Sequence, residues 1–256
     1  MIIKQDFYFH ALDANRPLHI RIPDGGEPPF PVMYFFDGHN LFRDEDATYG
    51  KSWGLDAYCA GWDKPVIIVG MECAHEGNRR LSEYLPYGTG YGWLRGVEPD
   101  GDKTMQALIY ELKPYIDSAF PTIPFRECTA IGGSSMGGLM AAYALVRYNR
   151  FLSKAACLSP SIGSVSGKLW HDMNNTELSP DTRIYLSWGT QEGYGGIKNP
   201  QEEDRSSYLY KTCRTTANKV LKAGGAAKLY CQVGGRHCEE DWEKQLPLFM
   251  PFLWQE

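Results

Sequence analysis

Short apolar runs that are typical of β-strands alternate along the chain with longer segments that are typical of helices. The apolar runs predict strands over residues 19–22, 32–36, 66–70, 128–132, 155–159, 183–188 and 228–233. Apolar residues at helical spacing predict helices over residues 102–119, 136–148 and 205–222, with a terminal helix that begins near Glu239. Strands that alternate with helices form a mostly parallel sheet with helices on both faces. The sequence therefore predicts a doubly wound α/β fold.

The chain is predicted to form a single domain over residues 1–256. This length lies within the range of single α/β domains, and the sequence contains no internal repeat and no linker long enough to divide it. Two segments, 86–103 and 192–204, are too long to be simple connections. We expect these two segments to be cap loops.

Charge and composition exclude several classes of partner. The formal net charge is −5 at pH 7, and the basic residues are scattered, so no basic stripe is available for a nucleic-acid backbone. The first ten residues lack the pattern of a secretory signal, and no segment approaches the ~18 apolar residues of a membrane span. The seven cysteines form no C-x-x-C pair, which favours reduced thiols. We therefore expect a cytoplasmic protein without a nucleic-acid or membrane partner.

A glycine- and serine-rich stretch follows the predicted strand 128–132 directly. It contains no lysine after its glycines, so it does not match a phosphate-binding loop, and its glycine spacing does not match a dinucleotide fingerprint. A Gly-x-Ser-x-Gly frame fits residues 133–137 and places Ser135 at its centre. Because this frame lies between a strand and a helix, it predicts the sharp turn that presents a nucleophilic serine. The backbone N–H of Met136 is then available to an oxyanion.

A nucleophilic serine requires a base, and the base requires an acid that orients it. In the doubly wound hydrolase architecture the acid and then the histidine follow the serine on loops after later strands. His237 follows the last predicted strand, and Glu192 follows the strand 183–188. Asp181 precedes that strand and is predicted to lie at the wrong edge of the sheet. Three further carboxylates are alternatives to Glu192: Glu202, Glu203 and Asp204.

Four stretches of the chain resemble the esterase D-like family of α/β-hydrolases, which includes feruloyl, acetylxylan and siderophore esterases. The stretches are residues 32–42, 132–138, 185–193 and 234–242. The resemblance implies a Ser135–His237–Glu192 triad and an oxyanion hole formed by the backbone N–H groups of His39 and Met136. Asp37 and His39 could also form an acid–base or metal pair, but two ligands without a third make a poor metal site. We therefore expect Asp37 to hold the loop in place.

These residues predict a serine carboxylic-ester hydrolase that forms an acyl-enzyme and uses no metal or cofactor. Three alternatives remain open: an acyltransferase with the same triad, a ligand-binding module that retains the fold without catalysis, and hydrolysis of a peptide or amide. Four aromatic residues of one glycine-rich loop could face the substrate or pack together as a small lid: Tyr84, Tyr87, Tyr91 and Trp93. Aromatic faces suit an aromatic acyl group or an acetylated sugar, so we expect a small-molecule ester of one of these kinds. The sequence does not predict the oligomeric state.

Overall fold

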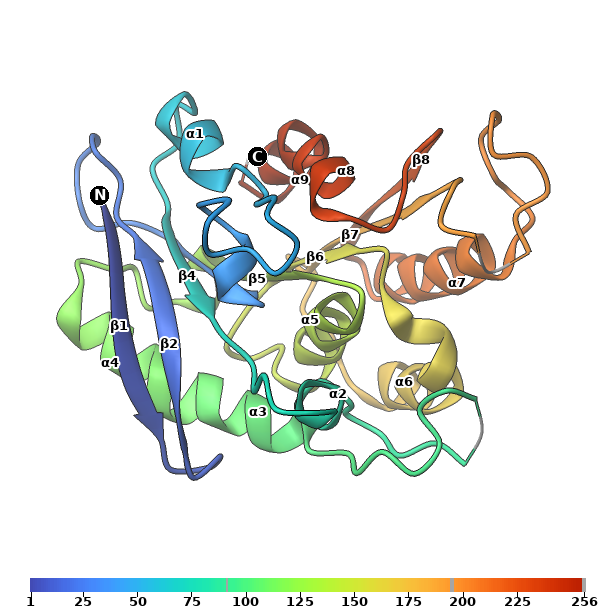
Figure 1. The fold of residues 1–256 in the computed structure, drawn as a ribbon, viewed down its shortest axis with the longest axis horizontal. Coiled ribbons are helices and arrows are strands. Elements are labelled where there is room, and N and C mark those ends of the chain that lie inside the picture. Colours follow the sequence, from blue (N-terminus) through green and yellow to red (C-terminus); the bar gives the residue numbers. More distant parts are fainter. Residues whose placement is uncertain (91, 194–195, 255–256) are drawn as a thin grey trace.

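The computed structural model describes residues 1–90, 92–193 and 196–254 (Figure 1). Its strands form one eight-stranded sheet with the order β1-β2-β4-β3-β5-β6-β7-β8. Strands β3 to β8 run parallel to one another, whereas β1 and β2 pair antiparallel at one edge. The bounds are β1 (Ile2–Phe9), β2 (Ala14–Arg21), β3 (Val32–Phe36), β4 (Ile67–Met71), β5 (Thr129–Ser134), β6 (Lys154–Leu158), β7 (Arg183–Gly189) and β8 (Ala226–Gln232). The prediction of a mostly parallel α/β sheet is confirmed.

Helices cover both faces of the sheet, as predicted (Figure 1). The helices on one face contribute to one apolar cluster, and three helices on the other face contribute to a second cluster. The first group is α3 (Gly101–Ala107), α4 (Lys113–Ala119), α5 (Met136–Arg147), α6 (Ser166–Asn175) and α7 (Tyr208–Lys222). The second group is α1 (Leu55–Ala60), α8 (Glu239–Glu243) and α9 (Leu246–Trp254). A short helix, α2 (Arg79–Glu83), precedes α3, and a π-helical turn (Leu108–Leu112) joins α3 to α4.

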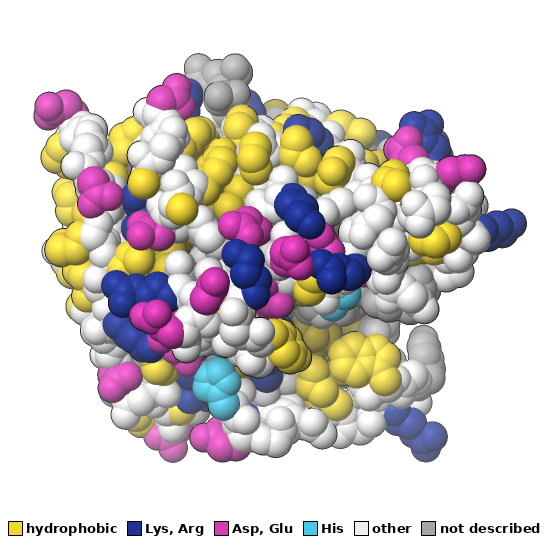
Figure 2. All heavy atoms as spheres, turned by 45° about the horizontal axis from the view of Figure 1, so that its top comes forward, with side chains coloured by type: hydrophobic (Ala, Val, Ile, Leu, Met, Phe, Trp, Pro, Cys, Tyr) yellow, Lys and Arg dark blue, Asp and Glu magenta, His cyan; other side chains and the backbone are white. Residues whose placement is uncertain are grey.

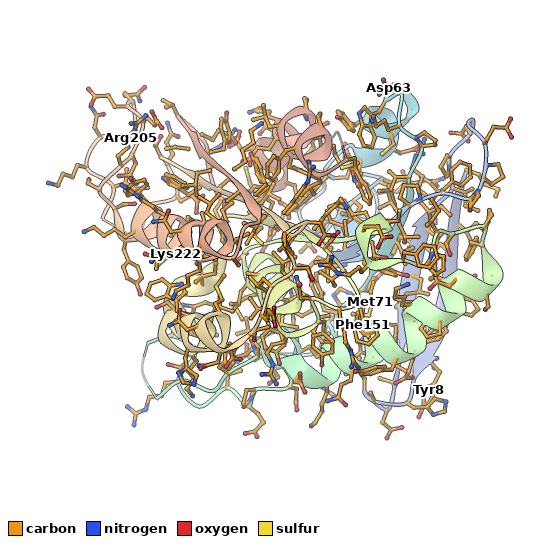
Figure 3. All side chains as sticks on the ribbon, turned by 180° about the vertical axis from the view of Figure 1, so that it is seen from behind. Tyr8, Asp63, Met71, Phe151, Arg205 and Lys222 are labelled. Atoms are coloured by element: carbon orange, nitrogen blue, oxygen red, sulfur yellow. The ribbon has the colours of Figure 1, made fainter. Side chains whose placement is uncertain are left out.

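Strand β3 shows why the sheet has an apolar layer on each side. Tyr34 and Phe36 belong to the first cluster, and Met33 and Phe35 belong to the second. Successive side chains of a strand point to opposite faces, so a strand that is buried on both faces needs a continuous apolar run. Figure 3 shows the contrast between Met71, which lies in the interior, and peripheral residues such as Asp63 and Arg205.

Several parts of the fold were not predicted from the sequence, among them strand β1 and helices α1, α2 and α6. Strand β1 contains charged and amide residues, and most of its side chains remain partly or fully exposed because it is the edge strand. A 3₁₀ turn (Ser161–Val165) and helix α6 fill the connection between β6 and β7, where no helix was predicted.

Among the described residues, no helix combines the length and apolar character that crossing a membrane requires. The single-domain assignment stays a prediction.

Candidate active site

Ser135 occupies a strained turn between β5 and α5. Its backbone has φ 56° and ψ −118°, outside the regions that a residue with a side chain normally adopts. The turn is held by backbone hydrogen bonds: the Ser135 N–H donates to the Leu158 carbonyl (2.9 Å), and the Ser135 carbonyl accepts from the Ser161 N–H (2.9 Å). Strain of this kind persists only where the surrounding structure fixes it.

The glycines of the Gly-x-Ser-x-Gly frame are required by close backbone approach. A Cβ atom on Gly133 would lie 2.6 Å from the carbonyl carbon of Gly137. A Cβ atom on Gly137 would lie 3.0 Å from Cβ of Phe36. Larger residues at the first position would push the helix away from the strand, so the spacing of small residues follows from the turn itself.

His237 and Glu192 meet at the carboxyl edge of the sheet, after β8 and β7 respectively. The Nδ1 atom of His237 lies 3.0 Å from Oε2 of Glu192. The Glu192 side chain is fully buried, and the His237 side chain is 28% exposed. The second carboxylate oxygen of Glu192 accepts from the backbone N–H of Gly189 (2.6 Å) and from the hydroxyl of Ser159 (2.6 Å). Three hydrogen bonds therefore fix the carboxylate that faces the imidazole.

Ser159 and Trp242 make contacts that hold Glu192 and His237 in place. The indole Nε1–H of Trp242 donates to the Ser159 hydroxyl (3.0 Å), which in turn donates to Glu192. The Trp242 ring also packs edge-on against the His237 ring, with centroids 5.0 Å apart. Sequence reasoning did not identify Ser159, although its position directly after β6 is a signal that could have indicated it.

The alternative carboxylates lie elsewhere. Asp204 is buried, accepts from the backbone N–H groups of Ser206 (3.1 Å) and Ser207 (3.0 Å), and so stabilises the start of α7. Glu202 and Glu203 are exposed. The structure therefore brings Glu192 to His237, as the sequence predicted, and not one of the alternatives.

Two hollows meet at Ser135 and His237. The first has a volume of about 350 Å³ and is bordered mainly by polar side chains, among them Asp37, His39, His75, Arg80 and Glu239. The second has a volume of about 430 Å³ and has a mostly apolar wall that includes Trp93, Pro160, Tyr208 and Leu209. Ser135 thus lies where a polar and an apolar part of one molecule can be bound together.

His39 lies in a 3₁₀ turn (Gly38–Asn40) directly after β3, beside the first hollow. Asp37 precedes this turn in a left-handed conformation (φ 57°), and its carboxylate accepts from Nε (2.8 Å) and an Nη atom (2.7 Å) of Arg80. Burial by itself would raise the pKa of Asp37, but the Arg80 guanidinium outweighs burial and holds the pKa below its usual value. These contacts agree with the expected role of Asp37 in holding the loop.

The backbone N–H groups of His39 and Met136 are the predicted oxyanion donors. Within the part of the chain that the structure describes, neither group donates to a protein acceptor. The turn that carries His39 also packs tightly on β4, because a Cβ atom on Gly38 would lie 2.4 Å from the backbone of Gly70. The position of the His39 N–H is therefore set by the sheet.

Some residues of the aromatic loop pack in the interior, and another borders the site. Tyr84 is fully buried, and its hydroxyl accepts from the Asp37 N–H (3.0 Å), while the Tyr87 hydroxyl donates to an aspartate of α6 (2.7 Å). Trp93 is exposed and borders the apolar hollow. Tyr91 lies outside the described residues, as do residues 194–195 of the second predicted cap loop.

A cluster of imidazoles around Glu72 was not predicted from the sequence. Glu72 follows β4 and accepts from Nε2 of His19 (2.6 Å) and Nε2 of His75 (2.8 Å). Burial by itself would raise the pKa of Glu72, but these hydrogen bonds and the nearby imidazoles lower it to about 2. Burial lowers the pKa of His39, whose Nδ1 atom lies 4.0 Å from Oε2 of Glu72. Glu72 and His75 are three residues apart, but His19 and His39 come from two other segments, so no single sequence motif contains the cluster.

The order of these residues along the sheet defines the class of the protein. The strained serine follows a central strand, the acid follows the next strand but one, and the histidine follows the last strand. This is the arrangement of an α/β-hydrolase. Within that class, the family model described as "Putative esterase" matches residues 10–253, so the chain belongs to this family of esterases.

Two relatives are similar over much of the chain. The siderophore triacetylfusarinine C esterase of Aspergillus fumigatus is 22% identical over 239 residues, which cover 88% of this chain and 77% of that protein. The uncharacterized protein YbbA of Bacillus subtilis is 25% identical over 183 residues, which cover 64% of this chain and 62% of that protein.

Solved structures show the same fold. The BES protein from Bacillus cereus aligns with a TM-score of 0.74 and 19% identity, over 98% of this chain and 94% of that chain. An IroE-like serine hydrolase from Shewanella oneidensis aligns with a TM-score of 0.69 and 19% identity, over 96% and 80% of the two chains. The enterobactin esterase FES from Shigella flexneri aligns with a TM-score of 0.73 and 18% identity, over 100% of this chain and 59% of that chain.

Proposed function

We propose that this protein is a serine carboxylic-ester hydrolase with Ser135 as nucleophile, His237 as general base and Glu192 as the orienting acid. The observation that carries this proposal is that a strained Ser135 and a His237 hydrogen-bonded to buried Glu192 border one hollow. Membership in an esterase family and the likeness to a serine hydrolase support the same reaction.

In the first step Ser135 Oγ attacks the ester carbonyl and transfers its proton to Nε2 of His237. Glu192 accepts the Nδ1–H, and therefore selects the tautomer whose Nε2 carries the lone pair that takes that proton. The buried negative charge of Glu192 also stabilises the imidazolium that forms. The imidazolium then donates its proton to the departing alkoxide, which leaves as an alcohol.

The carbonyl oxygen becomes an oxyanion during the attack. We assign the stabilisation of this oxyanion to the backbone N–H groups of His39 and Met136. Met136 is the first residue of α5, so the positive end of the helix dipole also faces the oxyanion. Water then attacks the acyl-enzyme with His237 again as the base, and the acid and free Ser135 are released. Both half-reactions use the same groups, so no metal or cofactor takes part in the proposed mechanism.

We propose a small-molecule ester with one aromatic or apolar arm and one polar arm as the substrate. The apolar hollow presents the exposed rings of Trp93 and Tyr208 near Ser135, and aromatic rings stack favourably on such faces. The polar hollow offers hydrogen-bonding groups on the other side of Ser135. An aromatic acyl ester fits this division well, and an acetylated sugar could stack on the same rings. Two related esterases bear siderophores in their names, which supports a multiply functionalised ester.

The face drawn in Figure 2 gives no support for a nucleic-acid partner. Figure 2 shows acidic and basic side chains interspersed over the face that it presents, without a basic stripe.

Labelling by a fluorophosphonate tests the proposed nucleophile. Intact mass should show one adduct on the wild-type protein and on Ser134→Ala, and no adduct on Ser135→Ala. Ser134→Ala is the matched control because it removes the neighbouring hydroxyl and leaves the predicted nucleophile. If the wild-type protein takes up no label, the ligand-binding alternative replaces the enzyme. If hydrolysis of a phenolic ester in the presence of glycerol yields mainly acylated glycerol, the acyltransferase alternative is favoured.

A further inference from the structure

Three potential metal ligands converge beside the polar hollow. They belong to His39, Glu72 and His75, and one ligand atom from each of these side chains lies within 4.8 Å of the other two. His39 and Glu72 follow the neighbouring parallel strands β3 and β4, so the sheet itself brings them together. The hydrolytic mechanism makes no use of these side chains, because it requires only the backbone N–H of His39.

We propose that His39, Glu72 and His75 form a binding site for a divalent transition-metal ion of the Zn²⁺ type. Two imidazoles and one carboxylate are a donor set that Zn²⁺ prefers, and three protein ligands leave one position for water or a ligand. Harder ions such as Mg²⁺ and Ca²⁺ favour sites made of oxygen atoms and suit this set poorly.

The geometry of the cluster is close to that of a tetrahedral site. With metal–ligand distances of about 2.0–2.1 Å, neighbouring ligand atoms of a tetrahedron are separated by about 3.3 Å. In the structure, Oε2 of Glu72 lies 2.8 Å from Nε2 of His75 and 4.0 Å from Nδ1 of His39. The His75 side chain is 58% exposed and can rotate to lengthen its separation from Glu72, whereas the separation between His39 and Glu72 must shorten by about 0.7 Å. The site therefore needs only a side-chain adjustment.

The buried imidazole of His39 is the second observation that indicates a ligand. Its side chain is 8% exposed, and its Nδ1 atom has no hydrogen-bond partner within the described chain. Its other nitrogen, Nε2, lies 2.9 Å from the Thr48 hydroxyl and can donate to it. When Nε2 carries the proton, the Nδ1 lone pair has no donor within the described chain and lies 4.0 Å from Oε2 of Glu72, where a metal ion would be bound. An unsatisfied buried acceptor of this kind costs free energy that a bound cation would recover.

Further contacts orient the ligands in the way that metal sites require. Thr48 fixes the His39 ring, and His19 holds the second oxygen of Glu72 at 2.6 Å. Metal-binding imidazoles and carboxylates usually have such outer partners. His75 now donates its Nε2–H to Glu72, so binding must release this proton or shift it to the other ring nitrogen.

Spectroscopic titration of the full chain with Co²⁺ after removal of metals by a chelator tests the site directly. We expect one equivalent to bind with the visible absorption of four-coordinate Co²⁺ and without a thiolate charge-transfer band, since Cys73 also borders the hollow. Competition with Zn²⁺ should displace the Co²⁺. This readout does not depend on esterase activity, so failure of the proposed hydrolysis would leave it unaffected.

Three histidine variants locate the ion. His75→Ala should weaken binding by more than ~100-fold, because even changes to outer partners weaken metal sites by about 10–100-fold. His171→Ala removes an exposed histidine of α6 and is the matched control, with unchanged affinity expected. His237→Ala should also retain the site. The proposal is wrong if the wild-type protein binds no equivalent of Co²⁺, if binding shows thiolate ligation, or if His237→Ala and not His75→Ala abolishes binding.

Discussion

Replacement of Glu192 by glutamine should hold His237 in a tautomer that cannot accept the Ser135 proton. One carboxylate oxygen accepts from the buried Gly189 N–H and from the Ser159 hydroxyl. A backbone N–H can only donate, so the amide oxygen of the glutamine must occupy this position. The amide NH₂ group then faces Nδ1 of His237 and donates to it. The imidazole proton consequently moves to Nε2, which is the atom that must accept the Ser135 proton.

The expected loss of kcat follows from the free-energy cost of reversing the side-chain amide of the glutamine. The reversed orientation leaves the buried Gly189 N–H without an acceptor, at a cost of about 2 kcal/mol. Only about one molecule in 30 would then hold the productive tautomer. Loss of the negative charge beside the imidazolium lowers the rate further, and other triads lose about 10⁴-fold when the acid becomes an amide. We expect kcat to fall by about 10³-fold, which corresponds to about 4 kcal/mol in the activation free energy.

The assay is kcat for a phenolic ester, measured together with the midpoint of urea unfolding. Glu202→Gln makes the same chemical change at an exposed position of the same segment, and its kcat should be unchanged. Fluorophosphonate labelling of Glu192→Gln should slow in parallel with kcat, because both reactions need the deprotonated serine. A fall in kcat of less than tenfold in a folded Glu192→Gln protein would refute the assignment of Glu192 as the orienting acid.

Three further changes test the geometry of the site. Gly133→Ala should abolish most activity and lower the free energy of unfolding by about 1–3 kcal/mol, because its Cβ would lie 2.6 Å from helix backbone. Gly167→Ala on α6 is the control: its Cβ would meet open space, so urea unfolding should show a gain of up to ~1 kcal/mol in stability. Arg80→Met should lower the free energy of unfolding by about 3 kcal/mol, because it leaves the buried carboxylate of Asp37 without its ion-pair partner. Arg79 is exposed, so Arg79→Met should change the stability little. Equal effects of the two substitutions would contradict the ion-pair argument. Because the pKa of Glu72 is lowered to about 2 in the folded protein from 4.5, its stabilisation is complete above about pH 4.5 and is lost as the pH falls toward 2. Glu72→Gln should therefore flatten the pH dependence of the unfolding free energy in this window, and an unchanged slope would show that the carboxylate does not titrate there.

The sequence by itself determined the elements whose formation depends on neighbouring residues. The apolar runs of β3 to β8 and the helical spacing of α5 and α7 follow from periodicity, which acts within a few residues. The turn at Ser135 was also predictable, because its small neighbours and its strand and helix lie within one short segment. The positions of Glu192 and His237 followed from chain order, because the carboxyl ends of parallel strands meet at one edge of the sheet.

Tertiary structure alone decided the contacts between segments that are distant in sequence. Strand β1 exists because the edge of the sheet accepts a half-exposed strand that has no strong apolar pattern. The hydrogen bonds that Ser159 makes with Glu192 and with Trp242 join residues that follow β6, follow β7 and lie in α8. The imidazole cluster around Glu72 likewise requires the register of β3 against β4. Such contacts result from strand order and core packing, which involve the whole chain at once, and so no local pattern specifies them.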